Sequence, residues 1–313
     1  MSTTVNTATA DGLIEQQRHE WPMCGRNFDA LQQVRVKELQ LPGVTFKVQF
    51  NPGRIASSGA KVDAKAIAER PCFLCERNRP DVQRGIDVEG RYTLLVNPFP
   101  IFPRHLTIPD NTHTPQRIAG RITDMLALAA ALDGYVIFYN GPRCGASAPD
   151  HMHFQAGNAD FLSLPAAVDK APQETVATEG TATLKLCTAL PVRTFVIDAA
   201  RAADAEALFG RLLAAMPVRE GDEEAMMNVL AMARPHGTMR LIVIPRKRHR
   251  PSFYGTEGPG CMLISPASVD LGGVIITPRE ADFESVTAAD IMRLIDECCL
   301  NEQEINNIAR NVH

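Results

Sequence analysis

The chain has 313 residues, of which 45% are hydrophobic, and a formal net charge of −4 at pH 7. This length allows about two domains of roughly 100 to 200 residues, and the apolar content is that of ordinary globular cores. The slightly acidic balance argues against a dedicated nucleic-acid-binding protein, which usually carries a strong basic excess.

The first residues lack the basic and apolar regions of a signal peptide, and no segment approaches the ~18 consecutive apolar residues of a membrane span. We therefore expect a cytoplasmic protein with no membrane and no nucleic-acid partner. The eight cysteines are then better interpreted as thiols or metal ligands than as a disulfide framework.

In the first half, residues 1–40 are polar and are expected to be helical in part. Alternating or β-branched apolar residues predict strands at 44–50, about 91–97, about 105–108 and 135–139. A helix is expected from Thr114 or Pro115 through Leu132, because Thr114 can cap it and Pro115 suits its first turn. Gly134 would end it.

The second half repeats this order in weaker form. Strands are expected at 190–197, 239–244, about 261–265 and about 272–277, and helices at 202–216, 223–233 and 288–299. The basic run at 246–250 is interpreted as a solvated strand end, with the alternative that it helps to hold a phosphate. A stretch rich in Pro, Thr, Glu and Ala at 171–183 is the predicted boundary between the halves.

The stretch that carries most of the chemistry is 140–155, which ends in His151-Met152-His153-Phe154-Gln155. Successive side chains of a strand point to opposite faces, so His151, His153 and Gln155 would line one surface. The segment before them is rich in Gly, Ala, Ser and Pro and can bring backbone N–H groups close to an anion. The pattern predicts a histidine nucleophile that faces a phosphate site.

Asn140-Gly141, the Gly-Ala-Ser at 145–147 and the His-x-His-x-Gln at 151–155 together resemble the active-site signature of one branch of the histidine triad superfamily. This galactose-1-phosphate uridylyltransferase branch also holds the diadenosine tetraphosphate phosphorylases and the GDP-hexose phosphorylases. The sequence His-Met-His-Phe-Gln-Ala is more similar to the motif of the GDP-hexose phosphorylases than to that of the uridylyltransferases. Segments at 92–109 and 265–284 extend the resemblance over most of residues 72–284.

The resemblance implies an α+β fold of two histidine-triad-like modules, with mainly antiparallel sheets flanked by helices. Residues 1–175 would form the catalytic module with an N-terminal extension, and residues 176–313 a second, degenerate module without a His-x-His. A homodimer is also implied.

By the same resemblance, the catalytic residues are His153, His151 and Gln155, with His153 as the nucleophile. Neutral imidazole attacks phosphorus well near neutral pH. Gln155 stands where many histidine triad hydrolases have a third His; a carboxamide cannot act as a general acid, which favours transfer to phosphate over hydrolysis. The candidate substrate-binding residues are Asn140, Gly145, Ala146, Ser147 and Arg143.

A Cys-x-x-Cys knuckle at Cys72 and Cys75 could be a zinc site, a redox motif or two buried thiols. The resemblance to the uridylyltransferases implies a structural zinc held by Cys72, Cys75, His105 and His151. His113 competes with His105 as the third ligand.

We therefore expect a nucleotidyltransferase of the phosphorylase type, acting on a nucleoside diphosphate sugar or a dinucleoside polyphosphate through a covalent nucleotidyl-histidine. Phosphate is favoured as the acceptor. The alternatives are a hexose-1-phosphate uridylyltransferase, which the Cys-x-x-Cys knuckle favours, and a catalytically silent nucleotide-binding protein.

Overall fold

The centre of the molecule is one ten-stranded antiparallel sheet, described by a computed structural model of residues 4–55, 64–255, 257–258 and 260–312. In spatial order its strands are β3 (Gly85–Val88), β4 (Tyr92–Val96), β5 (His105–Pro109), β7 (His153–Asn158), β6 (Tyr135–Asn140), β11 (Met227–Ala233), β12 (Met239–Pro245), β10 (Thr194–Ala199), β9 (Ala182–Cys187) and β8 (Glu174–Glu179).

The strand order repeats from one half of the chain to the other. Three antiparallel strands, a helix and two more strands follow one another as β3, β4, β5, α5, β6, β7, and again as β8, β9, β10, α7, β11, β12. The two halves join where β6 pairs with β11, with Asn140 opposite Asn228. The predicted α+β class with mainly antiparallel sheets is confirmed.

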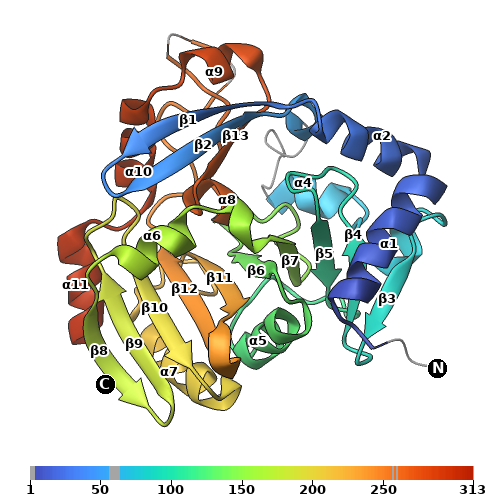
Figure 1. The fold of residues 1–313 in the computed structure, drawn as a ribbon. Coiled ribbons are helices and arrows are strands. Elements are labelled where there is room, and N and C mark those ends of the chain that lie inside the picture. The colour runs from blue at the N-terminus through green and yellow to red at the C-terminus, as the bar shows by residue number, and fades with distance from the viewer. Residues whose placement is uncertain (1–3, 56–63, 256, 259, 313) are drawn as a thin grey trace.

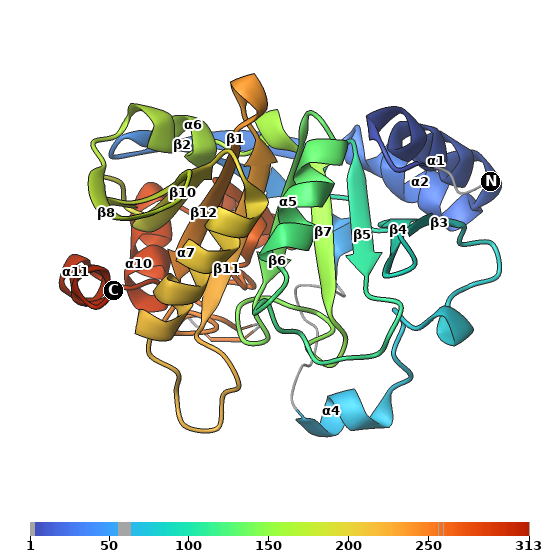
Figure 2. The same ribbon diagram turned by 90° about the horizontal axis from the view of Figure 1, so that it is seen from below.

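Helices cover one face of this sheet. The helices α5 (Ile122–Ala131) and α7 (Ala202–Ala215) lie side by side across its middle, and α1 (Thr7–Glu20) and α2 (Pro22–Leu31) lie near its β3–β4 end (Figure 2). Their apolar side chains share one core with alternate residues of the central strands.

A second core lies on the opposite face, under a three-stranded sheet (Figure 1). Its strands are β1 (Arg35–Leu41), β2 (Val44–Phe50) and β13 (Val274–Thr277), of which β13 runs parallel to β2. The other α-helices of the described residues are α4 (Ala64–Glu69), α6 (Leu164–Lys170), α8 (Ser268–Leu271), α9 (Glu280–Ser285), α10 (Ala288–Cys298) and α11 (Glu302–Arg310). Within the described part of the chain, no helix is long and apolar enough to cross a membrane.

Several predicted elements differ from the structure. Residues 227–233, expected to lie in a helix, form β11, which is buried along almost its whole length between β6 and β12. The predicted linker at 171–183 contains β8, paired with β9. Of the strand expected at about 261–265, the described residues form only an isolated bridge at Met262.

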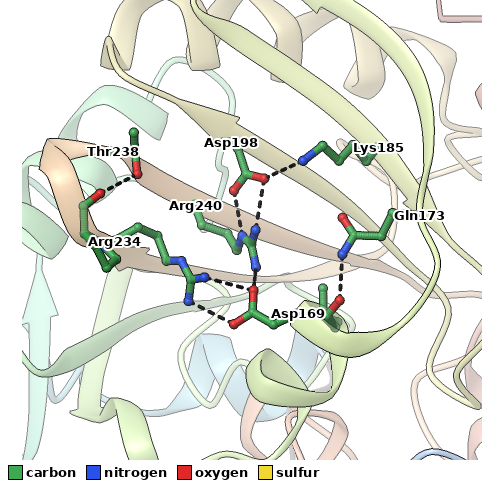
Figure 3. Close-up of polar contacts among 9 residues, drawn as sticks. Asp169, Gln173, Lys185, Asp198, Arg234, Thr238 and Arg240 are labelled. Carbon is green, nitrogen blue, oxygen red and sulfur yellow. Dashed lines mark hydrogen bonds and ion pairs between the residues drawn. The ribbon is translucent and has the colours of Figure 1, made fainter.

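An ion-pair network ties α6 to the second half of the large sheet (Figure 3). The guanidinium of Arg240 on β12 lies between two carboxylates: Nε and Nη2 donate to Asp198 at 2.6 and 3.0 Å, and Nη1 donates to Asp169. Arg234 adds two bonds to Asp169, and Lys185 adds one to Asp198. Only 9% of the Arg240 side chain is exposed, so this network is close to a buried one.

Candidate active site

A cavity of about 660 Å³ lies on the face of the large sheet opposite α5 and takes side chains from both halves of the chain. Its polar lining includes Asn140, Ser147, His153 and Gln155 from the predicted motif, and Arg54, Arg70, His249, Arg250, Ser265 and Asp270 from elsewhere. The motif therefore lines a cavity large enough for a nucleotide-sized ligand.

The strand periodicity of the motif is confirmed for β7. Phe154 and Ala156 pack into the core beneath α5, whereas His153 and Gln155 face the cavity. His151 precedes the strand and departs from the expected common surface. It is not among the described residues that line the cavity.

His153 is held in one tautomer. Its Nδ1 lies 2.8 Å from the carbonyl oxygen of His151 and donates to it, so Nε2 carries the free lone pair. The ring is 3% exposed, and burial lowers its pKa to about 4. Near pH 7 the imidazole is therefore neutral, which a nucleophile requires.

Gln116 fixes the backbone around His153, although no motif in the sequence points to this residue. Its Oε1 accepts the backbone N–H of His153 at 2.8 Å, and its Nε2 donates to the carbonyls of His153 and Asn140, both at 3.0 Å. These bonds hold residues 114–121 against the strand ends. The helix predicted from Thr114 or Pro115 accordingly begins only at Ile122.

Asn140 has its oxygen fully engaged by the second half of the chain. Its Oδ1 accepts from Asn228 Nδ2 at 2.9 Å and from the backbone and hydroxyl of Ser268 at 2.8 and 2.7 Å. Arg246, at the start of the basic run, donates to Asn228 at 2.6 Å and is 4% exposed, so the interpretation of that residue as solvated is wrong. Because the Oδ1 of Asn140 already accepts these bonds, its Nδ2 amide group can donate to a ligand in the cavity.

The loop before β7 places Gly145, Ala146 and Ser147 at the cavity wall. Gly145 has a φ of +96°, and a Cβ there would lie 2.5 Å from that of Ala267, so only glycine fits without displacement. Arg143 points away: its side chain is 60% exposed and pairs with Asp222, and it is not among the cavity-lining residues that the structure describes.

Three other arginines line the cavity: Arg54 and Arg70, which the sequence did not single out, and Arg250 from the basic run. Arg70 holds the loop, because Nη2 donates to Asp150 at 2.9 Å and to the carbonyl of Ser147 at 3.3 Å. Arg54 donates to the carbonyl of Phe99, and Arg250 Nε donates to Ser265 Oγ at 3.0 Å. The positive charge of these three residues at the cavity wall favours an anionic ligand.

A thiol and imidazole cluster lies beside the loop. The potential ligand atoms of Cys72, Cys75, His113 and His151 all lie within 4.8 Å of one another. The Sγ atoms of Cys72 and Cys75 are 3.2 and 3.5 Å from His151 Nδ1, and Cys75 Sγ is 3.2 Å from His113 Nδ1.

These separations fit a tetrahedral zinc site, in which neighbouring S and N ligands lie roughly 3.5 Å apart. His151 Nε2 donates to the carbonyl of Asp110 at 2.8 Å, the outer-shell bond that typically orients a ligating histidine. The donor set is the predicted one with one correction: His113 lies in the cluster and His105 does not.

His105 lies instead in the sheet, fully buried. Its Nδ1 accepts the backbone N–H of Ile101 at 3.1 Å, and its Nε2 lies 3.2 Å from Gln155 Oε1. In the pairing of β5 with β7, His105 is opposite Gly157, whereas Pro109 at the other end of β5 is opposite His153. His151 therefore lies beyond the end of β5 that leads to His113.

Comparisons with known proteins agree with this architecture. Residues 13–158 match a family model described as a domain of unknown function (DUF4922), and residues 167–313 match one described as GDPGP1-like, C-terminal domain. The curated protein diadenosine 5',5'''-P1,P4-tetraphosphate phosphorylase 2 of Saccharomyces cerevisiae is 30% identical over 135 residues. That alignment covers 38% of this chain and 41% of the yeast protein.

Solved structures show the same fold. The yeast Ap4A phosphorylase Apa2 in complex with Ap4A superposes with a TM-score of 0.57 at 18% identity, over 90% of this chain and 97% of the yeast chain. The structure of Apa2 in complex with AMP superposes with a TM-score of 0.54 at 19% identity, over 90% of this chain and 98% of the yeast chain. These matches support the resemblance to the branch of the histidine triad superfamily that holds the GDP-hexose and Ap4A phosphorylases.

Proposed function

We propose that this protein is a nucleotidyltransferase of the phosphorylase type, which transfers a nucleotidyl group to inorganic phosphate through a covalent intermediate on His153. The observation that carries the proposal is the orientation of His153, whose Nδ1–H is bound to the His151 carbonyl so that a neutral Nε2 faces the cavity. The phosphorylase activity of the yeast relative supports it.

In the first step, Nε2 of His153 attacks the α-phosphorus of the donor. An N–P bond forms, and the bond from the α-phosphorus to the bridging oxygen breaks. The ring becomes cationic, and the His151 carbonyl that accepts from Nδ1–H stabilises that charge. The distal half leaves as a phosphate oxyanion, so this leaving group needs no proton.

In the second step, an oxygen of inorganic phosphate attacks the same phosphorus. The P–O bond forms, the N–P bond breaks and neutral His153 is restored. The amides of Asn140 and of the 145–147 loop can stabilise the developing charge on the equatorial oxygens. Gln155 can donate to these oxygens but cannot activate water, which supports phosphorolysis over hydrolysis.

Zinc has a structural role in this proposal. Bound by Cys72, Cys75, His113 and His151, it would fix the position of His151, whose carbonyl sets the tautomer of His153. The metal would act on the fold of the loop, and the phosphoryl transfer itself would use only side chains and backbone amides.

For the donor we favour a dinucleoside polyphosphate or a nucleoside diphosphate sugar. The yeast relative is named as acting on diadenosine tetraphosphate, and its solved structures hold Ap4A and AMP. Apolar side chains of the cavity wall, including Trp21, Phe73 and Phe99, offer surfaces for a base or sugar. We retain the division into a catalytic first module and a degenerate second one, with the boundary moved from 175/176 to just before β8, because β8 begins at Glu174 and pairs with β9.

A hexose-1-phosphate uridylyltransferase is the second candidate, because the Cys-x-x-Cys knuckle lies in the metal cluster. A panel of dinucleoside polyphosphates and nucleoside diphosphate sugars, each with phosphate, with a hexose 1-phosphate or with neither, separates the two. We expect nucleoside diphosphate to accumulate only with phosphate. Turnover with hexose 1-phosphate alone would favour the uridylyltransferase, and no turnover with any pair would favour a silent binding protein.

A further inference from the structure

His105 is a buried histidine outside the metal cluster, and its surroundings define its tautomer. The ring is 0% exposed and packs edge-on against Phe102, with ring centroids 5.3 Å apart. Nδ1 accepts the backbone N–H of Ile101 at 3.1 Å, so Nδ1 carries a lone pair and no proton. In a neutral imidazole the proton must then be on Nε2.

The acceptor for that Nε2–H lies in the cavity wall. Gln155 Oε1 lies 3.2 Å from it, and an N–H donor can only be met by the oxygen of a carboxamide. Asn97 Nδ2 is 3.5 Å from the same nitrogen but is itself a donor, and it donates to Thr107 Oγ1 at 3.1 Å. The bond from His105 therefore determines which end of Gln155 is free.

We propose that His105 is a positioning residue for nucleotidyl transfer: by holding the carboxamide oxygen of Gln155, it turns the Gln155 amide group toward the phosphate that His153 attacks. Both Gln155 and His153 line the cavity and lie two residues apart on β7. The inference rests on the proposed function, because it assigns Gln155 the task of donating to that phosphate.

Burial keeps this arrangement intact over the working pH range. Desolvation, with a smaller contribution from the charge of Arg54, lowers the pKa of His105 to about 3. A protonated ring would direct an Nδ1–H at the N–H of Ile101, with no acceptor between them. The neutral Nε2–H form is thus the form that the fold selects.

A double-mutant cycle tests the proposal. We measure the rate of nucleotidyl-His153 formation from Ap4A, and the affinity for AMP, in His105→Phe, Gln155→Ala and the double variant. Phe keeps the apolar contacts and removes the donor. We expect each single variant to slow the first step roughly 100-fold, the usual effect of losing one donor to an oxyanion. The double variant should be no slower than Gln155→Ala, because His105 acts through Gln155.

Multiplying effects in the double variant, or a wild-type rate in His105→Phe, would overturn the proposal. His105→Gln, which can accept from Ile101 and donate to Gln155, should recover most of the rate. Phe102→Leu is the packing control and should lower stability while the rate stays within about threefold, as expected away from the reacting groups.

Two further readouts keep the result unambiguous. If the wild type forms no adduct, the proposed function fails, yet AMP affinity still tests His105: the same non-additive loss supports the positioning role and additive losses overturn it. If His105→Phe does not fold, ¹⁵N shifts of the wild-type ring decide. A proton found on Nδ1 of His105 would overturn the proposal.

Discussion

At the residue scale, the side chains at and around the proposed nucleophile, His153, share one property. One end of each side chain is hydrogen-bonded to a buried partner, so the other end can meet a ligand. His153 donates from Nδ1, Asn140 accepts three bonds on its oxygen, and Gln155 accepts one from His105. These hydrogen bonds orient the donors before the reaction, so no free energy of reorganisation is needed in the transition state.

Asn228→Asp tests this commitment at Asn140. Aspartate can still pair with Arg246, but it cannot donate to Asn140 Oδ1 or to the carbonyl of Cys144. We expect nucleotidyl-His153 formation to slow by about 10- to 100-fold, in line with the loss of a preorganised donor.

The matched control is Ser268→Ala, which keeps the backbone N–H that donates to Asn140 and should lose only a few-fold in rate, as for one of several bonds. A wild-type rate for Asn228→Asp, with the fold intact by circular dichroism, would contradict the role given to this amide.

At the scale of elements, local patterns predicted β7 and the sides its residues take, because period-two alternation survives folding. They failed for β11, since a strand buried on both faces has no alternation to detect. They also failed to choose between His105 and His113. That choice depends on the register of β5 against β7, which no local pattern encodes.

Zinc content tests the corrected ligand set. Purified protein should carry about one zinc per chain, and Cys72→Ser and His113→Ala should each lose metal together with thermal stability, because structural zinc contributes directly to folding. His105→Gln should retain full zinc. If elemental analysis found that His105→Gln lost the metal and His113→Ala kept it, then His105, and not His113, would be the ligand.

The ion-pair network around Arg240 joins β12, β10 and α6, which are different elements from β6 and β7 of the candidate site (Figure 3). Arg240→Met should leave Asp169 and Asp198 facing each other and lower the free energy of unfolding by about 2 kcal/mol. That is less than the roughly 3 to 5 kcal/mol of a fully buried pair, because both carboxylates are partly exposed.

Urea denaturation measures this loss, and adduct formation at 20 °C should be unaffected. Arg293→Met, which removes a surface pair with Glu297, should cost less than about 1 kcal/mol. An equal loss in the two variants would mean that the network is no more than a surface feature.

At the scale of the whole molecule, the two halves form one sheet, and the second half supplies partners for the site although it has no His-x-His. Asn228, Arg246 and Ser268 orient Asn140 across the junction of β6 and β11. The sequence predicted two modules of like order. It could not predict these contacts, because they arise only when the modules pair edge to edge.

Buried neutral histidines should make this fold acid-sensitive. The pKa values of His105 and His153 are lowered to about 3 and about 4, so between pH 6.5 and 4 the unfolded chain binds protons that the native protein does not. Each histidine then removes up to about 1.4 kcal/mol of stability per pH unit as the pH falls.

In urea titrations at pH 7, 6, 5 and 4.5, the pH dependence should be shallower by about that slope in His105→Gln, because one such proton uptake is lost. Phe102→Leu, which removes no titrating group, should shift all the values equally. Parallel curves for wild type and His105→Gln would mean that the pKa of His105 is the same in the folded and unfolded states, which would contradict this prediction.

The central claim is that His153 becomes covalently nucleotidylated, and intact-mass spectrometry tests it most directly. Incubation with Ap4A or a nucleoside diphosphate sugar, without phosphate, should add one nucleoside monophosphate to the chain. The adduct should be acid-labile, map to the peptide that contains His153 and disappear on adding phosphate, with release of nucleoside diphosphate. His153→Ala should form none while it still binds AMP. An adduct on another residue, or turnover by His153→Ala at the wild-type rate, would contradict the account.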